Sequence, residues 1–337
     1  MKYHTWIFLA IGIGILALLV LFIGPVKIEE ALILANPWYV LIALAIQFVL
    51  YVLWTERWSI NIDAVGISIK KLPLFPMTLV GKGINNITPA GGGEPVRAYI
   101  LSKFTQSPTE TSFASVIADR GLDTFPLFLL AIITIISAVL YLKLSFFLIL
   151  TLTISLVILV ILFIIGFYMS INQEMGERVT KWIVTAIKRF SKKEHSKLEK
   201  DALNALNGFQ SSIRTVIKSR NVLLYALPLS FLIWFIEIIR LYIIFLAFNT
   251  HVSLLIIASV FVISALIALI PVLPGGVGAV DGMMIIIFSI AGVPPSISAA
   301  ATIIERLISF WMTSFIGVAL IPYYGSAVLD KLSGKIR

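Results

Sequence analysis

Charged side chains interrupt apolar segments of this sequence, in positions where they could bind an anion. In the stretch 84–97, INNITPAGGGEPVR, Glu94 and Arg97 are three residues apart. That spacing places both side chains on one face of a helix. A carboxylate can hold a neighbouring guanidinium in place, and an arginine beside a broken helix offers donors to a phosphate. The chemistry that these residue types favour is recognition of a phosphate group.

The candidate ligand-binding residues are polar or ionisable side chains in or near two segments that contain Pro and Gly clusters. They are Asn85, Asn86, Thr88, Glu94, Arg97, Asp119, Arg120, Asp281, Glu305 and Arg306. We expect the arginines to bind the ligand and the carboxylates to hold them when the site is empty. Asn85, Asn86 and Thr88 either donate to a head group or cap the broken helix. Glu237 and Arg240, also three residues apart, form a further candidate ion pair, either structural or functional.

Covalent catalysis has little support in the sequence. The chain has no Cys, which excludes thiolate nucleophiles and cysteine-ligated metals. Its His residues, His4, His195 and His251, are far apart in the chain. No pair of a nucleophile and a base is evident. We therefore expect no metal site, no cofactor and no enzymatic activity.

The composition indicates an integral membrane protein. Of the 337 residues, 59% are hydrophobic and 13% are charged, whereas soluble domains carry about 25% charged residues. Apolar runs occupy 5–24, 37–54, 124–142, 146–168, 221–248 and 254–273. Each has roughly the 18 or more residues that a helix needs to cross the bilayer. The sequence predicts an all-α polytopic membrane protein with about six transmembrane helices.

The basic residues set the expected topology. Eleven Lys or Arg lie between residues 170 and 220, and such clusters remain in the cytoplasm. Both termini, Arg57, Lys70 and Lys71 then fall on the cytoplasmic side of the cell membrane. Apolar residues recur at helical spacing in 170–220, which predicts two amphipathic helices that either lie on an anionic leaflet or pack on the protein. Because the charge of +9 is concentrated there, we expect no nucleic-acid partner.

Two segments fit this topology only if they enter and leave the membrane on the same face. They are 72–104 and 254–292, and they predict re-entrant hairpins, because non-helical backbone within a bilayer must be enclosed by protein or water. Glu94 precedes Asp119 by 25 residues, and Asp281 precedes Glu305 by 24. This match predicts inverted repeats, 37–142 and 221–322, in a single membrane domain, 1–337.

The predicted hairpin tips are rich in Pro and Gly. The residues expected to shape them are Pro89, Gly91, Gly92, Gly93, Pro274, Gly275, Gly276 and Gly278. We expect the two tips to approach each other near the middle of the membrane. We also expect Arg97, Arg120 and Arg306 to face one cavity between them.

The motifs NNITPAGGGEPVRAYIL, VIADRGLD, LPGGVGAVDG and ERLISFW resemble the lysylphosphatidylglycerol synthase transmembrane-domain family. The resemblance covers residues 5 to 325 approximately. It implies a helical fold with two re-entrant elements around a lipid-sized cavity, and movement of a phospholipid or polyprenyl-linked lipid across the bilayer. The soluble synthase domain of full-length members has no counterpart here, so we do not expect aminoacyl transfer.

Transport of an anionic lipid is the function that the sequence favours, because inverted repeats with broken helices are typical of transporters. The lipid would be a phospholipid or a polyprenyl phosphate. One alternative is a membrane-embedded transferase or hydrolase that acts on a lipid phosphate. Another is a scaffold for a lipid glycosyltransferase. Besides the lipid, the candidate partners are a lipid-modifying enzyme and a second copy of the chain.

Overall fold

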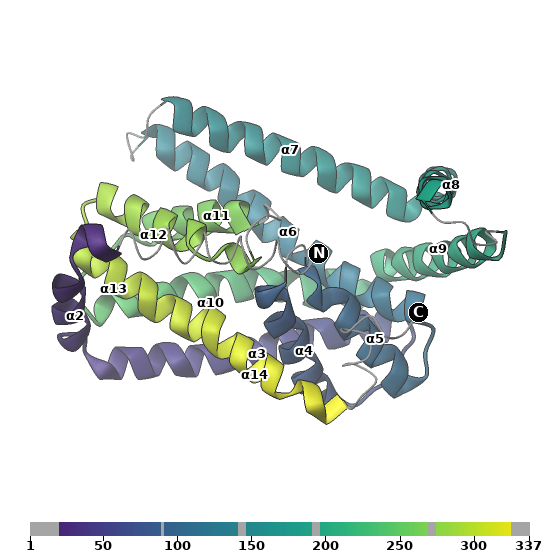
Figure 1. Ribbon diagram of the computed structural model, residues 1–337, viewed down its shortest axis with the longest axis horizontal. Helices are drawn as coiled ribbons and strands as arrows, with labels where there is room; N and C mark the ends of the chain where they lie inside the picture. The colour runs from purple at the N-terminus through teal and green to yellow at the C-terminus, as the bar shows by residue number, and fades with distance from the viewer. Residues whose placement is uncertain (1–19, 89–90, 141–145, 191–195, 269–273, 325–337) are drawn as a thin grey trace.

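The fold is seen in a computed structural model, which describes residues 20–88, 91–140, 146–190, 196–268 and 274–324. Within these ranges the regular structure is helical and contains no strand (Figure 1). Most of the predicted first helix, both termini and Pro89 lie outside the described residues.

Among the described residues, four helices are long and apolar enough to cross a membrane. They are Pro37–Ala64, Thr153–Ile171, Val222–Leu246 and Pro295–Tyr324. The chain is therefore a multi-pass helical membrane protein, as the composition indicates. The count of about six spans and the re-entrant nature of the hairpins stay predictions.

The first half of the chain is a long helix, two short helices and another long helix. After the short α2 (Pro25–Ile33) come α3 (Pro37–Ala64), α4 (Lys71–Ile87), α5 (Gly93–Thr105) and α6 (Thr109–Leu140). Helix α3 begins where the Asn36 side chain accepts a hydrogen bond from the Trp38 N–H at 3.0 Å. The next residue is Pro37, which has no N–H to leave unpaired in the first turn.

The second half has the same order of long and short helices. It comprises a π-helical turn η2 (Val222–Ala226), α10 (Leu227–Leu246), α11 (Leu254–Ala268), the 3-10 turn η3 (Pro274–Gly276), α12 (Ala279–Ile290), α13 (Pro295–Arg306), a second π-helical turn η4 (Leu307–Trp311), α14 (Met312–Ala319) and a last 3-10 turn η5 (Ile321–Tyr324). Helices α13 and α14, joined through η4, form one continuous span.

The contacts between helices fall into matching pairs. Helix α4 packs on α5 as α11 packs on α12, and α5 packs on α6 as α12 packs on α13. Across the halves, α4 packs on α14 while α11 packs on α6, and the first helices, α3 and α10, pack on each other. In Figure 1, α4 and α5 lie toward the end of the molecule that carries α9, and α11 and α12 lie toward the end that carries α2. This is the contact pattern that a two-fold relation between the halves would produce.

Glycine allows the closest of these contacts between the halves. A Cβ atom placed on Gly83 of α4 would lie 2.9 Å from Gly317 Cα of α14 and 3.0 Å from the Thr313 carbonyl oxygen. Small residues let membrane helices approach at backbone distance, where van der Waals packing is strongest. The first hairpin is thereby fixed against the last helix of the second half.

Three helices connect the two halves: α7 (Phe146–Ile171), α8 (Gln173–Phe190) and α9 (Ser196–Lys218). Helix α9 packs on α6, where the Phe113 and Phe209 rings lie 5.9 Å apart. The sequence left open whether the amphipathic helices of 170–220 lie on the membrane surface or pack on the protein. Helix α9 packs on the protein. Helix α7 lies along the outside of the bundle (Figure 1). Only 6% of the residues in the apolar stretch that makes it a candidate span are buried.

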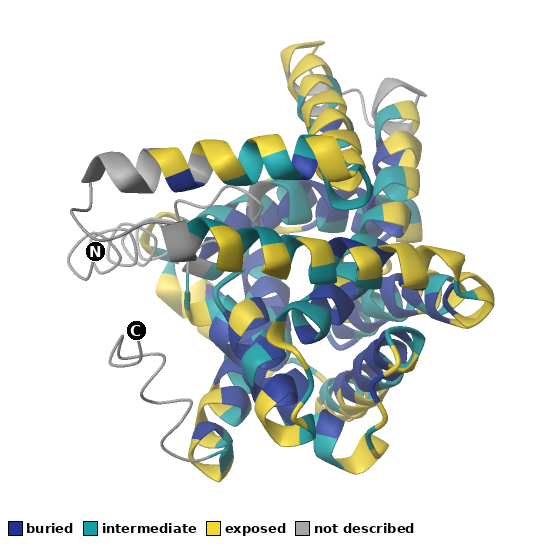
Figure 2. Ribbon diagram, turned by 90° about the vertical axis from the view of Figure 1, so that its right-hand side faces the viewer, coloured by how far each residue is buried: buried dark blue, intermediate teal, exposed yellow. Residues whose placement is uncertain are grey.

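Burial follows the arrangement of the helices. Figure 2 shows the buried residues where the helices meet, with exposed residues along their outer faces. Many of the exposed residues are large and apolar, such as Ile161 and Leu162 on α7. In a membrane protein such side chains face the hydrocarbon of the bilayer, so the buried polar residues in the interior are the ones that need an explanation.

Candidate functional site

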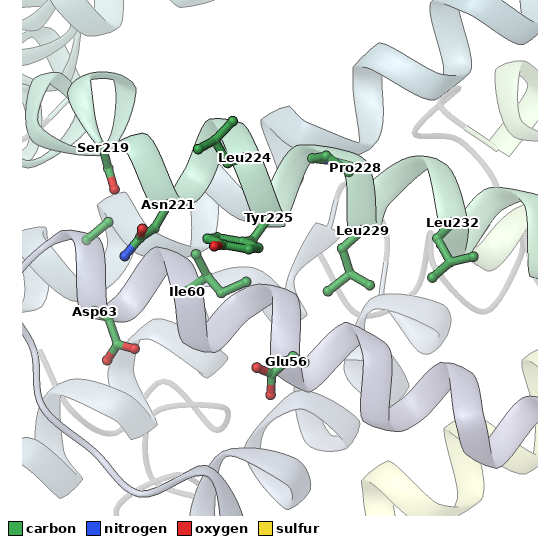
Figure 3. A pocket seen from close by; sticks show the side chains of 11 residues that line it. Glu56, Ile60, Asp63, Ser219, Asn221, Leu224, Tyr225, Pro228, Leu229 and Leu232 are labelled. Carbon is green, nitrogen blue, oxygen red and sulfur yellow. The ribbon is translucent and has the colours of Figure 1, made fainter.

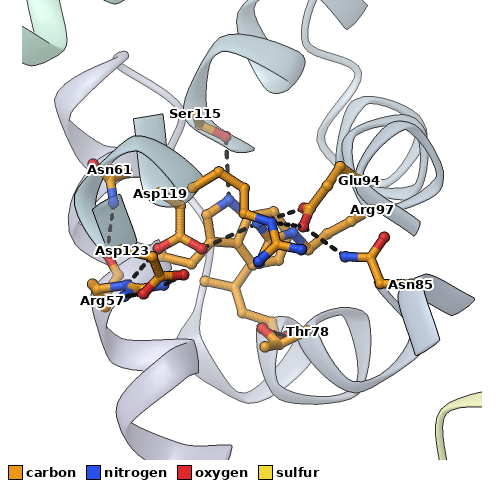
Figure 4. A network of polar contacts seen from close by, with 12 residues as sticks. Arg57, Asn61, Thr78, Asn85, Glu94, Arg97, Ser115, Asp119 and Asp123 are labelled. Atoms are coloured by element: carbon orange, nitrogen blue, oxygen red, sulfur yellow. Dashed lines mark hydrogen bonds and ion pairs between the residues drawn. The ribbon is translucent and has the colours of Figure 1, made fainter. Parts of the chain in front are cut away.

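The first half contains a buried network of ion pairs centred on Arg57 of α3 (Figure 4). Arg57 has no exposed surface. Its Nε donates to Asp119 Oδ1 at 2.8 Å, and its Nη2 donates to Asp123 Oδ2 at 3.1 Å, while Nη1 contacts the other Asp123 oxygen. Asp119 and Asp123 lie one turn apart on α6, so both carboxylates face α3. A buried guanidinium requires such partners, because an unpaired charge is costly at this depth.

Arg97 of α5 extends this network and is enclosed by it. Its Nη2 lies 3.1 Å from Asp119 Oδ2 and 3.0 Å from Glu94 Oε2. The guanidinium carbon lies 4.4 Å from the centre of the Trp58 ring, a cation–π contact. Only 2% of Arg97 is exposed. Arg97 therefore holds α5 against α3 and α6, and a ligand could reach it only if these contacts opened.

Arg120, next to Asp119 on α6, points in another direction. Its Nε lies 2.6 Å from Glu94 Oε1, and 45% of its side chain is exposed. Successive residues of a helix point about 100° apart, so Asp119 faces the buried network while Arg120 faces outward. Arg120 is the accessible arginine of the first half.

The break between α4 and α5 is fixed by polar side chains. The Asn85 amide nitrogen donates to Glu94 Oε1 at 2.6 Å, and its oxygen accepts from the Gly93 N–H at 2.7 Å. The Thr88 hydroxyl donates to the Ile84 carbonyl at 2.6 Å. Asn85 and Thr88 therefore cap the ends of the broken helix, which is one of the two roles that the sequence suggested for them.

Asn86 connects the first hairpin to the second half. Its amide nitrogen donates to the Phe310 carbonyl at 3.2 Å and to Ser314 Oγ at 3.1 Å. The tip of the second hairpin lies beside it, because a Cβ atom on Gly275 would stand 2.6 Å from the Asn86 carbonyl oxygen. The tip of the second hairpin therefore contacts the end of α4, just before the Gly-rich break of the first hairpin.

The second half has its own ion pair at a hairpin. Arg306 of α13 lies with its Nε 2.6 Å from Asp281 Oδ1, and its Nη2 donates to the Gly275 carbonyl at 3.0 Å. The Phe310 ring lies under the guanidinium, 4.2 Å away. Asp281 also accepts from the Gly278 N–H at 2.7 Å, at the start of α12. Gly278 has φ +82°, a conformation that glycine adopts at little cost.

Arg240 of α10 pairs across helices. Its Nη2 donates to Glu305 Oε1 at 2.8 Å and its Nε to Glu305 Oε2 at 3.3 Å. Its Nη1 donates to the buried Gln47 of α3. The sequence predicted a Glu237–Arg240 pair instead. Arg240 faces α13 and α3, and no ion pair of Glu237 is seen in the described part of the chain.

The ion pairs of the two halves occupy corresponding positions. In each half the acid of a hairpin holds an arginine of the fourth helix, which gives Glu94–Arg120 and Asp281–Arg306. The acid that precedes that arginine in sequence holds an arginine of the first helix, which gives Asp119–Arg57 and Glu305–Arg240. The matched spacing in the sequence thus reflects two matched sets of ion pairs.

The accessible arginines face different cavities. Arg306 lines a cavity of about 200 Å³ with Arg240, Glu237 and Glu305. Arg120 lines a separate cavity of about 460 Å³ beside α7. The prediction that Arg97, Arg120 and Arg306 face one cavity is therefore wrong. Arg97 is enclosed by carboxylates and Trp58, and Arg120 faces a cavity bounded by α6, α7, α9 and η2.

A further cavity lies between α3 and the segment formed by η2 and α10 (Figure 3). Its volume is about 770 Å³, and Glu56, Asp63 and Asn221 supply polar groups to its lining. None of the candidate residues lines this cavity. Over the described part of the chain, no cluster of three or more His, Cys, Asp or Glu is placed to hold a metal ion.

The sequence reasoning missed Arg57, which the topology had assigned to the cytoplasmic surface. Helix α3 continues to Ala64, ten residues beyond the apolar run that ends at Trp54. The available signal was a helical stripe of polar and aromatic residues that includes Gln47, Tyr51 and Trp58. Such a stripe in an apolar helix indicates a face directed at a polar interior.

The fold and the buried ion pairs define a polytopic helical membrane protein whose polar core is built by two corresponding halves. The lysylphosphatidylglycerol synthase TM region family matches residues 7–317, and the chain belongs to this family. It is 54% identical over the whole of both chains to a UPF0104 membrane protein of Methanothermobacter thermautotrophicus. A UPF0104 membrane protein of Methanocaldococcus jannaschii is 31% identical over 93% of each chain. One from Pyrococcus horikoshii is 24% identical, over 94% of this chain and 96% of its own.

Proposed function

We propose that the protein moves a phosphate-bearing lipid across the cell membrane without changing it chemically. The lipid is a phospholipid or a polyprenyl phosphate, and its head group passes between the two hairpins. The observation that carries the proposal is the matched pair of contacts Glu94–Arg120 and Asp281–Arg306, at 2.6 Å each.

Each of these contacts can be exchanged for a contact with a phosphate. Carboxylates and phosphates both offer anionic oxygens to the guanidinium, and arginine binds either one in a charge-assisted manner. Arg120 and Arg306 line cavities, whereas Arg57 and Arg97 are enclosed. When a head group replaces Glu94 at Arg120, Glu94 keeps Arg97 as its partner, 3.0 Å away. When one replaces Asp281 at Arg306, Asp281 keeps the Gly278 N–H.

The arrangement of the hairpins supports alternating access. In transporters built from inverted repeats, the substrate lies where broken helices meet, and rocking of one repeat against the other exposes it to each side. The contact between Gly275 and Asn86 brings the two broken segments together. In this proposal the hairpins are re-entrant from opposite faces, and both termini are cytoplasmic.

The test is transport of fluorescent lipids in liposomes that contain the purified protein. Chemical reduction of the probe in the outer leaflet measures how much lipid has moved. Arg306→Gln removes the charge while keeping a polar side chain. Hydrogen bonds to charged groups contribute roughly 1.5–3 kcal/mol, so we expect transport to slow by roughly ten- to a hundredfold.

Arg178→Gln is the matched control. Arg178 lies on α8, where its side chain is 75% exposed and lies 3.8 Å from Glu174, its one ion-pair partner among the described residues. We expect this variant to transport lipid at the wild-type rate. Equal rates for wild type, Arg306→Gln and protein-free liposomes would overturn the proposal.

A further inference from the structure

An apolar groove lies between α6, α7, α9 and η2, and it meets the first set of ion pairs at Arg120. Its volume is about 460 Å³, which is within the range of roughly 300–1,000 Å³ usual for ligand sites. Its lining includes Phe125 of α6 and Phe163 and Phe167 of α7. The Phe125 and Phe163 rings lie 5.8 Å apart, and the Phe163 and Phe167 rings 6.2 Å apart, so the aromatic side chains form a continuous wall.

Of the described residues that line the groove, Arg120 alone is charged. Within the described part of the chain its only ionic partner is Glu94, which faces its Nε and leaves the terminal amino groups without a hydrogen bond. Guanidinium donors that face an apolar groove without acceptors are costly to desolvate. An anionic group in the groove would remove that cost.

The outer wall of the groove is a helix that is exposed on its other face. Helix α7 forms this wall, and only 6% of the residues in its apolar stretch are buried. Two glycines, Gly121 and Gly166, also line the groove. A Cβ atom on either would meet nothing within 4 Å. The protein therefore leaves this space unfilled at both walls.

We propose that this groove binds one hydrocarbon chain of a phosphate-bearing membrane lipid, with the phosphate against the Arg120 guanidinium. The aromatic wall suits the chain, and the single positive charge suits the head group. The further role of the groove, as the place where lipid leaves the bilayer for the hairpins, rests on the proposed transport function. Glu94 links the two sites, because it pairs with Arg120 and also lies beside Arg97 and Asn85.

The experiment is photo-crosslinking of the full chain in phosphatidylcholine liposomes that contain phosphatidylglycerol with a diazirine in its acyl chain. Labelled peptides are identified by mass spectrometry. We expect label on the groove residues Phe125, Phe163 and Phe167 above the level on Ile161. Ile161 is 50% exposed and lies on another face of α7, outside the groove.

Two variants separate the chain from the head group. Gly166→Trp fills the groove, and we expect its groove label to fall to the level of Ile161, whereas Ile161→Trp keeps the wild-type pattern. Arg120→Gln should lower the preference for a phosphatidylglycerol probe over a phosphatidylcholine probe by about tenfold. Unchanged thermal melting of Gly166→Trp verifies that the fold is intact.

The outcomes distinguish this inference from the transport proposal. Label spread evenly around α7, or unchanged groove label in folded Gly166→Trp, would overturn the lipid site even if the wild type moves lipid. Groove label that Gly166→Trp abolishes, in a protein that moves no lipid, would support the lipid site and overturn transport. A wild-type transport rate in Gly166→Trp would overturn the entry role alone.

Discussion

The buried pair of Arg240 and Glu305 allows a quantitative test of how this core is stabilised. The two side chains are 2% and 4% exposed, and they meet through two hydrogen bonds. Arg240→Met or Glu305→Leu alone would leave the other charge buried without its partner. Such a change costs about 3–5 kcal/mol. The double variant removes both charges, and its main residual cost is the Gln47 oxygen that loses its donor, about 1–3 kcal/mol.

These magnitudes predict strong coupling. The two single changes sum to about 6–10 kcal/mol, while the double variant loses about 1–3 kcal/mol, so the coupling energy is at least about 3 kcal/mol. The measurement is thermal unfolding in detergent micelles, followed by tryptophan fluorescence. At about 2 °C per kcal/mol, each single variant should melt roughly 6–10 °C lower than wild type, and the double variant should recover most of that loss.

The control is the exposed pair of Lys71 and Glu56. Their charged atoms are 2.5 Å apart, but their side chains are 63% and 39% exposed. Such pairs contribute about 0–1 kcal/mol, so Lys71→Met and Glu56→Leu should melt within about 2 °C of wild type. Additive losses in the Arg240 and Glu305 variants, or losses no larger than those of the control pair, would refute the reasoning that desolvation dominates this site.

Two further predictions concern packing and topology. Gly83→Ala places a methyl group 2.9 Å from Gly317 Cα and should cost about 1–3 kcal/mol in unfolding free energy. Gly121→Ala meets nothing within 4 Å and should leave the melting temperature unchanged, so equal melting of the two variants would contradict the close approach of α4 and α14. Because the chain has no Cys, single variants Lys27→Cys and Lys71→Cys can be labelled selectively with a membrane-impermeant maleimide. We expect the reagent to reach them from opposite sides of the membrane, and labelling from the same side would contradict the topology.

Features that depend on local sequence could be predicted. A Pro or Gly cluster breaks a helix wherever it occurs in an apolar run, so the interruption near Gly91–Gly93 is visible without a structure. An acid followed directly by an arginine, repeated at nearly equal offsets, likewise marks corresponding positions. Family membership followed from the sequence motifs, and the helical membrane architecture followed from the composition and the apolar runs; both are confirmed.

The choice of ion-pair partners could not be predicted, because it depends on packing between helices distant in sequence. Glu237 lies one turn before Arg240, and that spacing favours a contact in an isolated helix. In the folded chain α10 packs on α13, and Glu305 lies where it can make two hydrogen bonds to the guanidinium. Burial removes water as a competitor, so two aligned bonds across helices outweigh one flexible contact along a helix.

The differences between the halves matter as much as their correspondence. If the two halves of an inverted repeat made identical contacts, the two access states would have equal free energy. A preference for one access state must therefore come from contacts that differ between the halves. The first set of ion pairs contains Arg97 on Trp58 and a second carboxylate, Asp123, on Arg57. In the second set Ser309 stands one turn after Glu305, where Asp123 stands one turn after Asp119 in the first. The Arg240 contact with Gln47 corresponds instead to the hydrogen bond that Arg57 donates to Ser230. Among the described residues, Arg57 is therefore ion-paired with two carboxylates and Arg240 with one. Opening the first half separates more buried charge, so in the proposed transport cycle it is the half that stays closed until a head group replaces Glu94 at Arg120.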